Sequence, residues 1–214
     1  MSRTVARAAG RARLALVAAT VAGTLGLAAC SLPGPGKPID ERTWLLEDPD
    51  AAAAAAAPAS RTVLRVSPAR AAPGFNTANM LYRRTPARLE RFAWQVWADT
   101  PAAMLTALIA ARLDQGGTYR AVLTGAADVP ADVRLDLHGC RLLQTFDGAR
   151  SAVTLELRAQ LLALPERRLL AARHFAYRVA ADSATPEAGV AAANAAVGKL
   201  LDDLQAFTAA AMNE

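Results

Sequence analysis

The feature that most constrains the fold is the segment SAVTLELRAQL, residues 151–161, in which apolar and polar side chains alternate without a break from Val153 onward. The apolar positions are Val153, Leu155, Leu157, Ala159 and Leu161, and the polar positions between them are Thr154, Glu156, Arg158 and Gln160. Successive side chains of a strand point to opposite faces of a sheet, so the pattern predicts a strand with one buried and one solvated face. Such a strand needs paired neighbours and a second layer over its apolar face.

Turn signals on both sides of this segment predict its neighbours. Asp147-Gly148 is a strong hairpin signal ahead of it, and Pro165-Glu166 marks a second turn after it. The segments beyond the turns, residues 132–146 and 168–179, carry the same alternation. Three such segments joined by short turns predict an antiparallel meander.

A change of phase at Gly139 predicts a β-bulge in the first of these strands. The apolar residues are Val133, Leu135 and Leu137 before the glycine, and Cys140, Leu142 and Phe146 after it. One extra residue in a strand reverses which side chains face the core, and glycine is the residue that most easily accommodates it.

Two segments predict helices. Thr100-Pro101 and Thr185-Pro186-Glu187 each combine a capping threonine with a proline in the first turn. Gly116-Gly117 ends the first helix. The apolar stripes are Met104, Leu105, Leu108, Ile109 and Leu113 in the first helix, and Val190, Val197, Leu200, Leu201, Leu204, Phe207 and Ala211 in the second. The expected fold is α+β: a single domain with a largely antiparallel β-sheet and two helices packed on it.

Shorter strands are expected upstream, at residues 62–66, 79–84, 91–98 and 118–123, with an edge strand within 43–50. Trp94 and Trp97 are three residues apart in one strand, so we expect them to face opposite sides. An exposed aromatic side chain would mark a contact surface. Four arginines, Arg83, Arg84, Arg88 and Arg91, surround the turn at Thr85-Pro86. They fit either a solvated hairpin end or a contact for anionic headgroups or an acidic partner, and the first reading is favoured.

The first 29 residues have the pattern of a secretory signal. Four arginines and no acidic residue precede an uncharged run from Leu14 to Ala29. This run is shorter than the roughly 20 apolar residues that span a bilayer. Leu27-Ala28-Ala29-Cys30 resembles the lipobox of bacterial lipoproteins, in which the signal is cut before a cysteine whose thiol is acylated. An ordinary signal peptide with an incidental cysteine and an uncleaved signal anchor are the alternatives.

The lipobox resemblance implies three segments. Residues 1–29 would be the signal peptide, 30–60 the lipidated Cys30 with a tether rich in proline, glycine and alanine, and 61–214 the folded domain. Ser31 rather than aspartate follows the cysteine, which by analogy with enteric bacteria favours the periplasmic face of the outer membrane.

Charge and chemistry exclude several function classes. Four of the 24 basic residues lie in the signal, which leaves 20 against 19 acidic residues, so the basic pI is no argument for nucleic acid. His138, His174 and Cys140 are the remaining candidates for catalysis, and they lie in expected strands without the spacing of a metal site or a nucleophile and base. We therefore expect no enzyme, no metal and no cofactor, and a buried, unpaired Cys140.

Residues 63–113 resemble the ABC-type transport auxiliary lipoproteins, of which the PqiC-like lipoproteins are the best-known members. The shared features are the leading strand VLRV, Pro73-Gly74-Phe75-Asn76-Thr77 before NMLYRR, the aromatic strand RFAWQVWAD and the helix opened by Thr100-Pro101. TWLL upstream corresponds to a short aromatic segment of the family. The alanine-rich insertion at 51–60 and Asp99-Thr100-Pro101 depart from the usual pattern.

The resemblance implies a non-enzymatic lipoprotein of the outer membrane. Its partners would be a periplasmic MCE-domain protein and an inner-membrane ABC permease and ATPase, in a system that moves lipid between membranes. By the same analogy we expect a ring-forming homo-oligomer. Cys30 would be the anchor, and the expected partner-binding residues are Phe75, Asn76, Tyr82, Trp94 and Trp97. The alternative is an assembly or structural lipoprotein that supports an outer-membrane protein or a lipopolysaccharide machine; a periplasmic hydrolase is a third class.

Overall fold

The computed structural model describes residues 40–51, 60–125 and 129–212. Cys30, the expected signal peptide and most of the alanine-rich insertion lie outside the described residues. In the described part of the chain, no helix is both long enough and apolar enough to cross a membrane.

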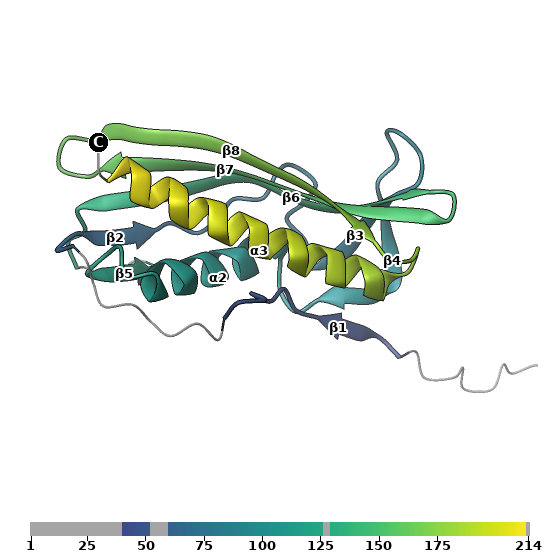
Figure 1. Cartoon of the computed structure of the whole chain (residues 1–214). Helices are drawn as coiled ribbons and strands as arrows, with labels where there is room; N and C mark the ends of the chain where they lie inside the picture. Colours follow the sequence, from purple (N-terminus) through teal and green to yellow (C-terminus); the bar gives the residue numbers. More distant parts are fainter. Residues whose placement is uncertain (1–39, 52–59, 126–128, 213–214) are drawn as a thin grey trace, which may run out of the picture. The chain divides into compact units, whose positions relative to one another are not determined.

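A meander of three long antiparallel strands forms one side of the sheet, as the alternation predicts (Figure 1). The strands are β6 (Val133–Asp147), β7 (Arg150–Ala163) and β8 (Arg168–Ala181). In β7, Leu155, Leu157 and Leu161 are fully buried, whereas the polar side chains between them are half-buried or exposed.

The bulge lies at the predicted position. Gly139 has φ of +68°, and the pairing of β6 with β7 shifts between His138 and Arg141. The shift keeps Leu137 and Cys140 both in the core, at 1% exposure each, although they are an odd number of residues apart.

Five shorter strands extend the sheet from the other edge of β6: β1 (Arg42–Trp44), β2 (Val63–Val66), β3 (Asn79–Arg83), β4 (Glu90–Trp97) and β5 (Ala121–Thr124). Next to the first half of β6 lies β2, followed by β5, and both pairings are parallel. Next to the second half lies β3, also parallel, followed by antiparallel β4 and parallel β1. The sheet is therefore mixed, with the antiparallel meander as its largest part.

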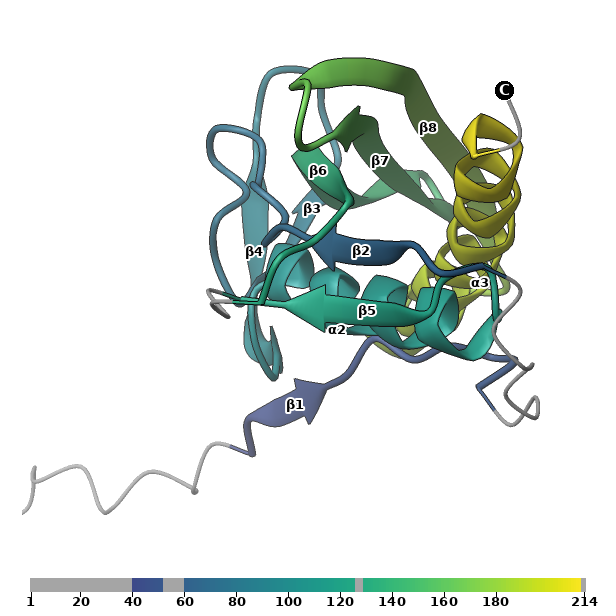
Figure 2. The same cartoon turned by 90° about the vertical axis from the view of Figure 1, so that its left-hand side faces the viewer.

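Both helices pack on the same face of this sheet (Figures 1 and 2). Helix α2 (Pro101–Gln115) lies against β5 and β6, and the 26-residue α3 (Pro186–Ala211) lies against β7 and β8. The Thr100 hydroxyl accepts a hydrogen bond from the amide of Ala103, and Thr185 accepts one from Ala188, which confirms both predicted caps. The α+β fold class is confirmed.

The core lies between the helices and the inner face of the sheet. Its fully buried large side chains come from both layers: Leu64, Leu135, Leu137, Leu155, Leu157 and Leu161 from the sheet, and Leu105, Ile109, Leu113, Leu200, Leu201 and Leu204 from the helices. Among the described residues no helix covers the opposite face, called here the outer face (Figure 2), and in β7 that face carries Thr154, Glu156, Arg158 and Gln160.

The segment after β1 is fastened across the helices, which the sequence does not indicate. Leu46 enters the core at 5% exposure, and Asp48 accepts two hydrogen bonds from Arg112 of α2. Asp202 of α3 accepts a further bond from Arg112. The compact unit therefore begins at Glu41, ahead of the expected boundary at residue 61.

Candidate functional site

Three aromatic rings from three strands meet at the end of the sheet where β3 and β4 lie. The ring centroids of Tyr82 and Phe92 are 4.5 Å apart, and Phe146 stands edge-on to them at 5.6 Å and 6.2 Å. The guanidinium of Arg84 lies 5.3 Å from the Tyr82 ring centroid and 5.6 Å from that of Phe146. All three rings are half-buried, so they form a surface that is both apolar and capped by a cation.

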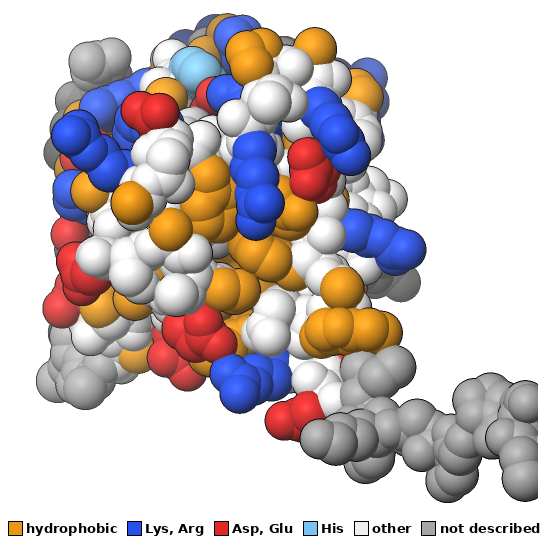
Figure 3. All heavy atoms as spheres, turned by 90° about the vertical axis from the view of Figure 1, so that its right-hand side faces the viewer, with side chains coloured by type: hydrophobic (Ala, Val, Ile, Leu, Met, Phe, Trp, Pro, Cys, Tyr) orange, Lys and Arg blue, Asp and Glu red, His pale blue; other side chains and the backbone are white. Residues whose placement is uncertain are grey.

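This end of the domain shows hydrophobic side chains gathered near its middle, with Lys or Arg and Asp or Glu around them (Figure 3). The Tyr82 hydroxyl donates a 2.8 Å hydrogen bond to Glu90, and this bond, together with burial, raises the pKa of Tyr82 above its usual value. The hydroxyl is therefore a fixed donor that orients the ring, and it does not titrate near neutral pH.

The two tryptophans of β4 face opposite sides, as predicted. Trp97 is 5% exposed and belongs to the core, whereas Trp94 is 49% exposed. Trp97 is therefore not accessible to a partner in this fold, which corrects its place among the expected contact residues.

The pairing of β4 with β3 is irregular around Trp94. Asn79 pairs with Val96 and Leu81 pairs with Arg91, so residues 92–95 of β4 stand opposite one residue of β3. Bulges of this kind redirect side chains and are frequent next to functional sites. Tyr82, Phe92 and Phe146 form the ring cluster, and Trp94 is exposed two residues after Phe92 on the same strand; these four residues are called the aromatic end below.

Phe75 lies apart from the aromatic end, on the outer face. The Arg141 guanidinium stacks 5.2 Å from the Phe75 ring centroid and pairs with Glu156 at 3.0 Å. A hollow of about 330 Å³ adjoins this ring, lined by Phe75, Arg83, Ala87, Arg88, Leu89, Arg141 and Leu143. Asn76 is exposed beside it. The expected contact residues therefore do not form one patch. Tyr82 and Trp94 belong to the aromatic end, Phe75 and Asn76 lie on the outer face, and Trp97 lies in the core.

The strand register explains this separation. Tyr82 lies opposite Gln144, whose side chain bonds to the carbonyl of Thr185 at the start of α3, so Tyr82 belongs to the helix side of the sheet. Arg141 and Leu143 are out of phase with Gln144 and face the other side.

The catalytic candidates are not assembled into a site. Cys140 is 1% exposed, and burial raises the pKa of its thiol to about 12, so it is protonated and unreactive near neutral pH. His174 is exposed on β8, and His138 is half-buried on β6. Within residues 40–51, 60–125 and 129–212, no group of three or more His, Cys, Asp or Glu side chains could hold a metal ion.

Known structures with this fold are similar over nearly their whole length. Protein XCC0632 from Xanthomonas campestris, described under the family DUF330, has a TM-score of 0.67 at 23% identity and covers 81% of this chain and 94% of its own. A second, uncharacterised protein has a TM-score of 0.58 at 14% identity and covers 78% and 98%. No curated protein sequence matches this chain at a significant level.

The sequence itself decides the family. A family model described as the ABC-type transport auxiliary lipoprotein component matches residues 44–205. That match runs from the end of β1 to the last turns of α3 and includes the aromatic end and the hollow beside Phe75. The chain therefore belongs to the family of ABC-type transport auxiliary lipoproteins.

Proposed function

We propose that this protein is an outer-membrane-anchored periplasmic lipoprotein that acts as a non-enzymatic auxiliary component of an ABC/MCE-type system for lipid transport between membranes. The family match over residues 44–205 carries the proposal. The family description supports a lipoprotein that works with an ABC transport system, and the MCE-domain partner and the outer membrane are the further steps proposed here.

Anchoring rests on Cys30. In the proposal the signal peptide, residues 1–29, is removed and the acylated Cys30 enters the membrane. Asp40, the first described residue, is ten positions after Cys30 in the sequence. At full extension ten residue steps span at most about 35 Å, which in the proposal limits how far Asp40 can lie from the membrane surface. Since β1 pairs with β4, the strand of Trp94 lies at the anchored end of the domain.

The aromatic end is the proposed contact surface for the MCE-domain protein. Trp94 is a large, half-exposed aromatic side chain, the type of residue that dominates binding energy at interfaces. Arg84 over Tyr82 and Phe146 adds a cation that would favour an acidic group at the rim of the partner surface. Phe75 and Asn76, on the outer face, form a second contact in the proposal, and Trp97 supports the surface from the core.

Lack of catalysis is part of the proposal. The one described cysteine is buried and protonated, and the two histidines lie on different strands of a solvated face. An auxiliary protein that binds and positions its partners needs surfaces rather than a nucleophile.

A gentle detergent pull-down of the tagged full-length protein, followed by mass spectrometry, tests the proposal. We expect an MCE-domain protein and ABC subunits in the eluate. The informative variant is Trp94→Ala, and its matched control is Leu169→Ala, because Leu169 is 52% exposed at the start of β8, on another strand. Trp94→Ala should reduce recovery of the MCE-domain protein about tenfold or more while Leu169→Ala leaves it unchanged.

Two results would count against the proposal. An outer-membrane barrel protein in place of the MCE-domain protein would move this chain to an assembly role. Equal recovery with Trp94→Ala and wild type would remove the aromatic end as the contact surface. Native mass spectrometry of the same eluate measures the proposed homo-oligomer.

A further inference from the structure

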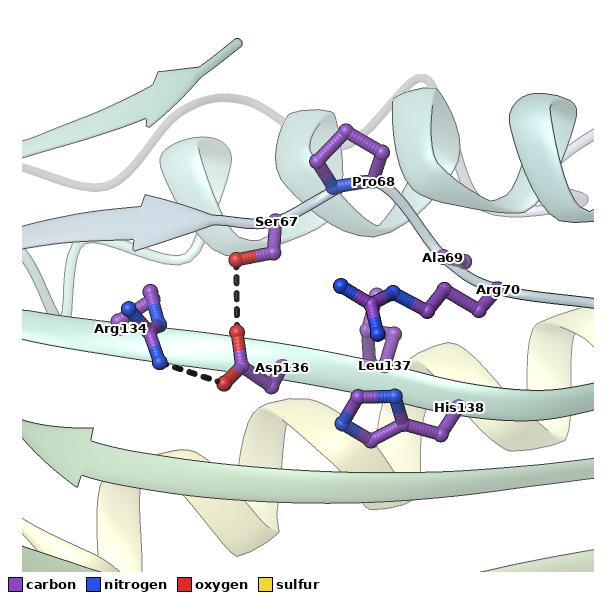
Figure 4. A pocket seen from close by; sticks show the side chains of 8 residues that line it. All are labelled: Ser67, Pro68, Ala69, Arg70, Arg134, Asp136, Leu137 and His138. Carbon is purple, nitrogen blue, oxygen red and sulfur yellow. Dashed lines mark hydrogen bonds and ion pairs between the residues drawn. The ribbon is translucent and has the colours of Figure 1, made fainter. Parts of the chain in front are cut away.

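A second hollow lies on the outer face, between the segment that follows β2 and the first half of β6 (Figure 4). Its volume is about 480 Å³, and its lining is Ser67, Pro68, Ala69, Arg70, Arg134, Asp136, Leu137 and His138. It shares no residue with the aromatic end or with the hollow beside Phe75. Ligand binding here is therefore separable from the contacts of the proposed function.

The carboxylate in this hollow is already satisfied. One oxygen of Asp136 accepts a 2.7 Å hydrogen bond from the Ser67 hydroxyl (Figure 4). The other accepts a 2.9 Å charge-assisted hydrogen bond from Nη2 of Arg134. Since Asp136 and Arg134 balance one another, the hollow does not present a negative site that would attract a metal cation.

Arg70 is the uncompensated cation of the hollow. Across the described part of the chain, its guanidinium makes no ion pair or hydrogen bond, although its backbone amide bonds to Leu137. Figure 4 shows its side chain extending over Leu137, with the His138 ring beneath it. A guanidinium has five N–H donors in a planar fork, and here all of them are available.

Arg134 and His138 add donors beside Arg70. Arg134 donates one of its five N–H groups to Asp136, and 39% of its side chain is exposed to solvent. Its buried Nε has no hydrogen-bond partner among the described residues. His138 supplies at least one ring N–H. Three side chains from two segments therefore point donors into a hollow whose net charge is positive.

We propose that this hollow is a binding site for the phosphate group of a phosphate ester. Arginine matches phosphate oxygens in a bidentate geometry, and charge-assisted hydrogen bonds of this kind are stronger than neutral ones. The hollow is larger than a phosphate group, so it also has room for the ester substituent. Phospholipid headgroups and inorganic phosphate share this chemistry, and the experiment separates them.

Isothermal titration calorimetry on the full-length protein in neutral detergent micelles tests the site. Three probes are used at low, constant ionic strength: inorganic phosphate, micelles that contain phosphatidic acid, and micelles that contain diacylglycerol, which has no phosphate. Low salt matters because exposed charges are screened over about 10 Å at 0.1 M. We expect saturable binding of the phosphate probes and none of diacylglycerol.

Two variants should change the affinity in opposite directions. Arg70→Gln should weaken phosphate binding about tenfold, because it removes a charge-assisted contact. Asp136→Asn should tighten binding, because it removes the carboxylate of the hollow and keeps an oxygen for Ser67. Arg120→Gln is the control: Arg120 is an exposed arginine before β5, outside the lining of the hollow, and its change should leave affinity unaltered.

The outcomes are distinguishable. Tighter binding of phosphatidic acid micelles than of inorganic phosphate, lost in Arg70→Gln, identifies a lipid headgroup site; equal affinities identify a site for phosphate itself. Absence of saturable binding by either phosphate probe, or affinity that is the same in wild type, Arg70→Gln and Asp136→Asn, overturns the proposal. Capture of the MCE-domain protein is measured separately, so failure of one proposal leaves the other standing.

Discussion

The ion pair between Asp48 and Arg112 makes a prediction whose size follows from the structure. Arg112 Nε lies 2.9 Å from one oxygen of Asp48, and its Nη2 bonds to the other, which gives a bidentate pair. The side chains are only 12% and 6% exposed. Because this pair fastens the segment after β1 to α2, we expect its removal to weaken the folded domain.

The two partners should not be equivalent. Asp48→Asn leaves Arg112 with Asp202 and with Asp50 at 3.7 Å, so the cation stays compensated. We expect a loss of about 1.5–3 kcal/mol in the free energy of unfolding, the range for a hydrogen bond to a charged group. Arg112→Gln leaves a buried carboxylate with one backbone donor, the amide of Asp50, and should cost about 3–5 kcal/mol.

Urea unfolding of the full-length protein in neutral detergent, followed by circular dichroism, measures these losses. The control is Arg42→Gln, which breaks an exposed pair with Glu187, 55% and 44% exposed, and should cost less than about 1 kcal/mol. The reasoning is refuted if Asp48→Asn costs as much as Arg112→Gln, or if neither exceeds the control.

The pH dependence of the same pair has a definite sign. Hydrogen bonds from Arg112 lower the pKa of Asp48 below its usual value, against the opposing effect of burial. A carboxylate with a lowered pKa stabilises the fold fully above its unfolded pKa, about 3.9, and that contribution is lost as pH falls through the folded value. The stability gap between wild type and Asp48→Asn should therefore be constant from pH 7 to about 5 and narrow below about pH 4. A gap that narrows between pH 7 and 5 would contradict this assignment.

Three further changes test the packing. Gly139→Ala should cost about 1–2 kcal/mol in urea unfolding, because φ of +68° disfavours a side chain while the space for one is open. A thiol reagent should leave native Cys140 unmodified at pH 8 and modify it at once in urea, as read by mass spectrometry. Gly189→Ala would place a Cβ 2.6 Å from Gln144 Cδ and disturb its bonds to Ser151 and Thr185, so it should cost about 1–3 kcal/mol. A double variant with Gln144→Ala should cost less than the sum of the single changes.

Local patterns account for the part of the fold that the sequence predicts. Alternation defines β7, a single glycine defines the bulge of β6, and threonine-proline pairs define the first residues of both helices. In each case the physical cause lies within a few residues of the effect, so one sequence is enough to locate it.

The parallel pairings could not be predicted in the same way. Strands β2 and β3 both pair with β6, although Val133 is 69 positions after its partner Leu64 and Gln144 is 62 positions after its partner Tyr82. Short apolar strands carry no signal for which neighbour they join or in which direction. The strand expected at Thr118–Leu123 is observed at Ala121–Thr124, and Tyr119 ahead of it is buried in the core.

The arrangement of the site could not be predicted either, because it depends on contacts between segments that are far apart in the sequence. Trp94 and Trp97 were expected on opposite sides, but the alternation does not say which side is the core. Phe75 lies seven residues before Tyr82, yet the intervening chain passes from the outer face to the helix side of the sheet. The ion pair of Asp48 and Arg112 joins residues that are 64 positions apart, and no local sequence motif predicts it.

In the proposal, the position of β1 links the proposed anchor at Cys30 to the proposed contact surface. Arg42 lies opposite Gln95 and Trp44 opposite Trp97, so the three residues of β1 attach directly to the strand that carries Trp94. The Trp44 indole also donates a 2.7 Å hydrogen bond to the Gln95 side chain. Beyond β1, the Asp48–Arg112 pair attaches the chain to α2. If Cys30 is the anchor as proposed, a force applied there would reach β4 and α2 together. In the proposed arrangement the aromatic end is therefore held near the membrane by the same short strand that orients it. In that arrangement a partner would have to come close to the membrane to contact Trp94, because the ten residue steps from Cys30 to Asp40 span at most about 35 Å.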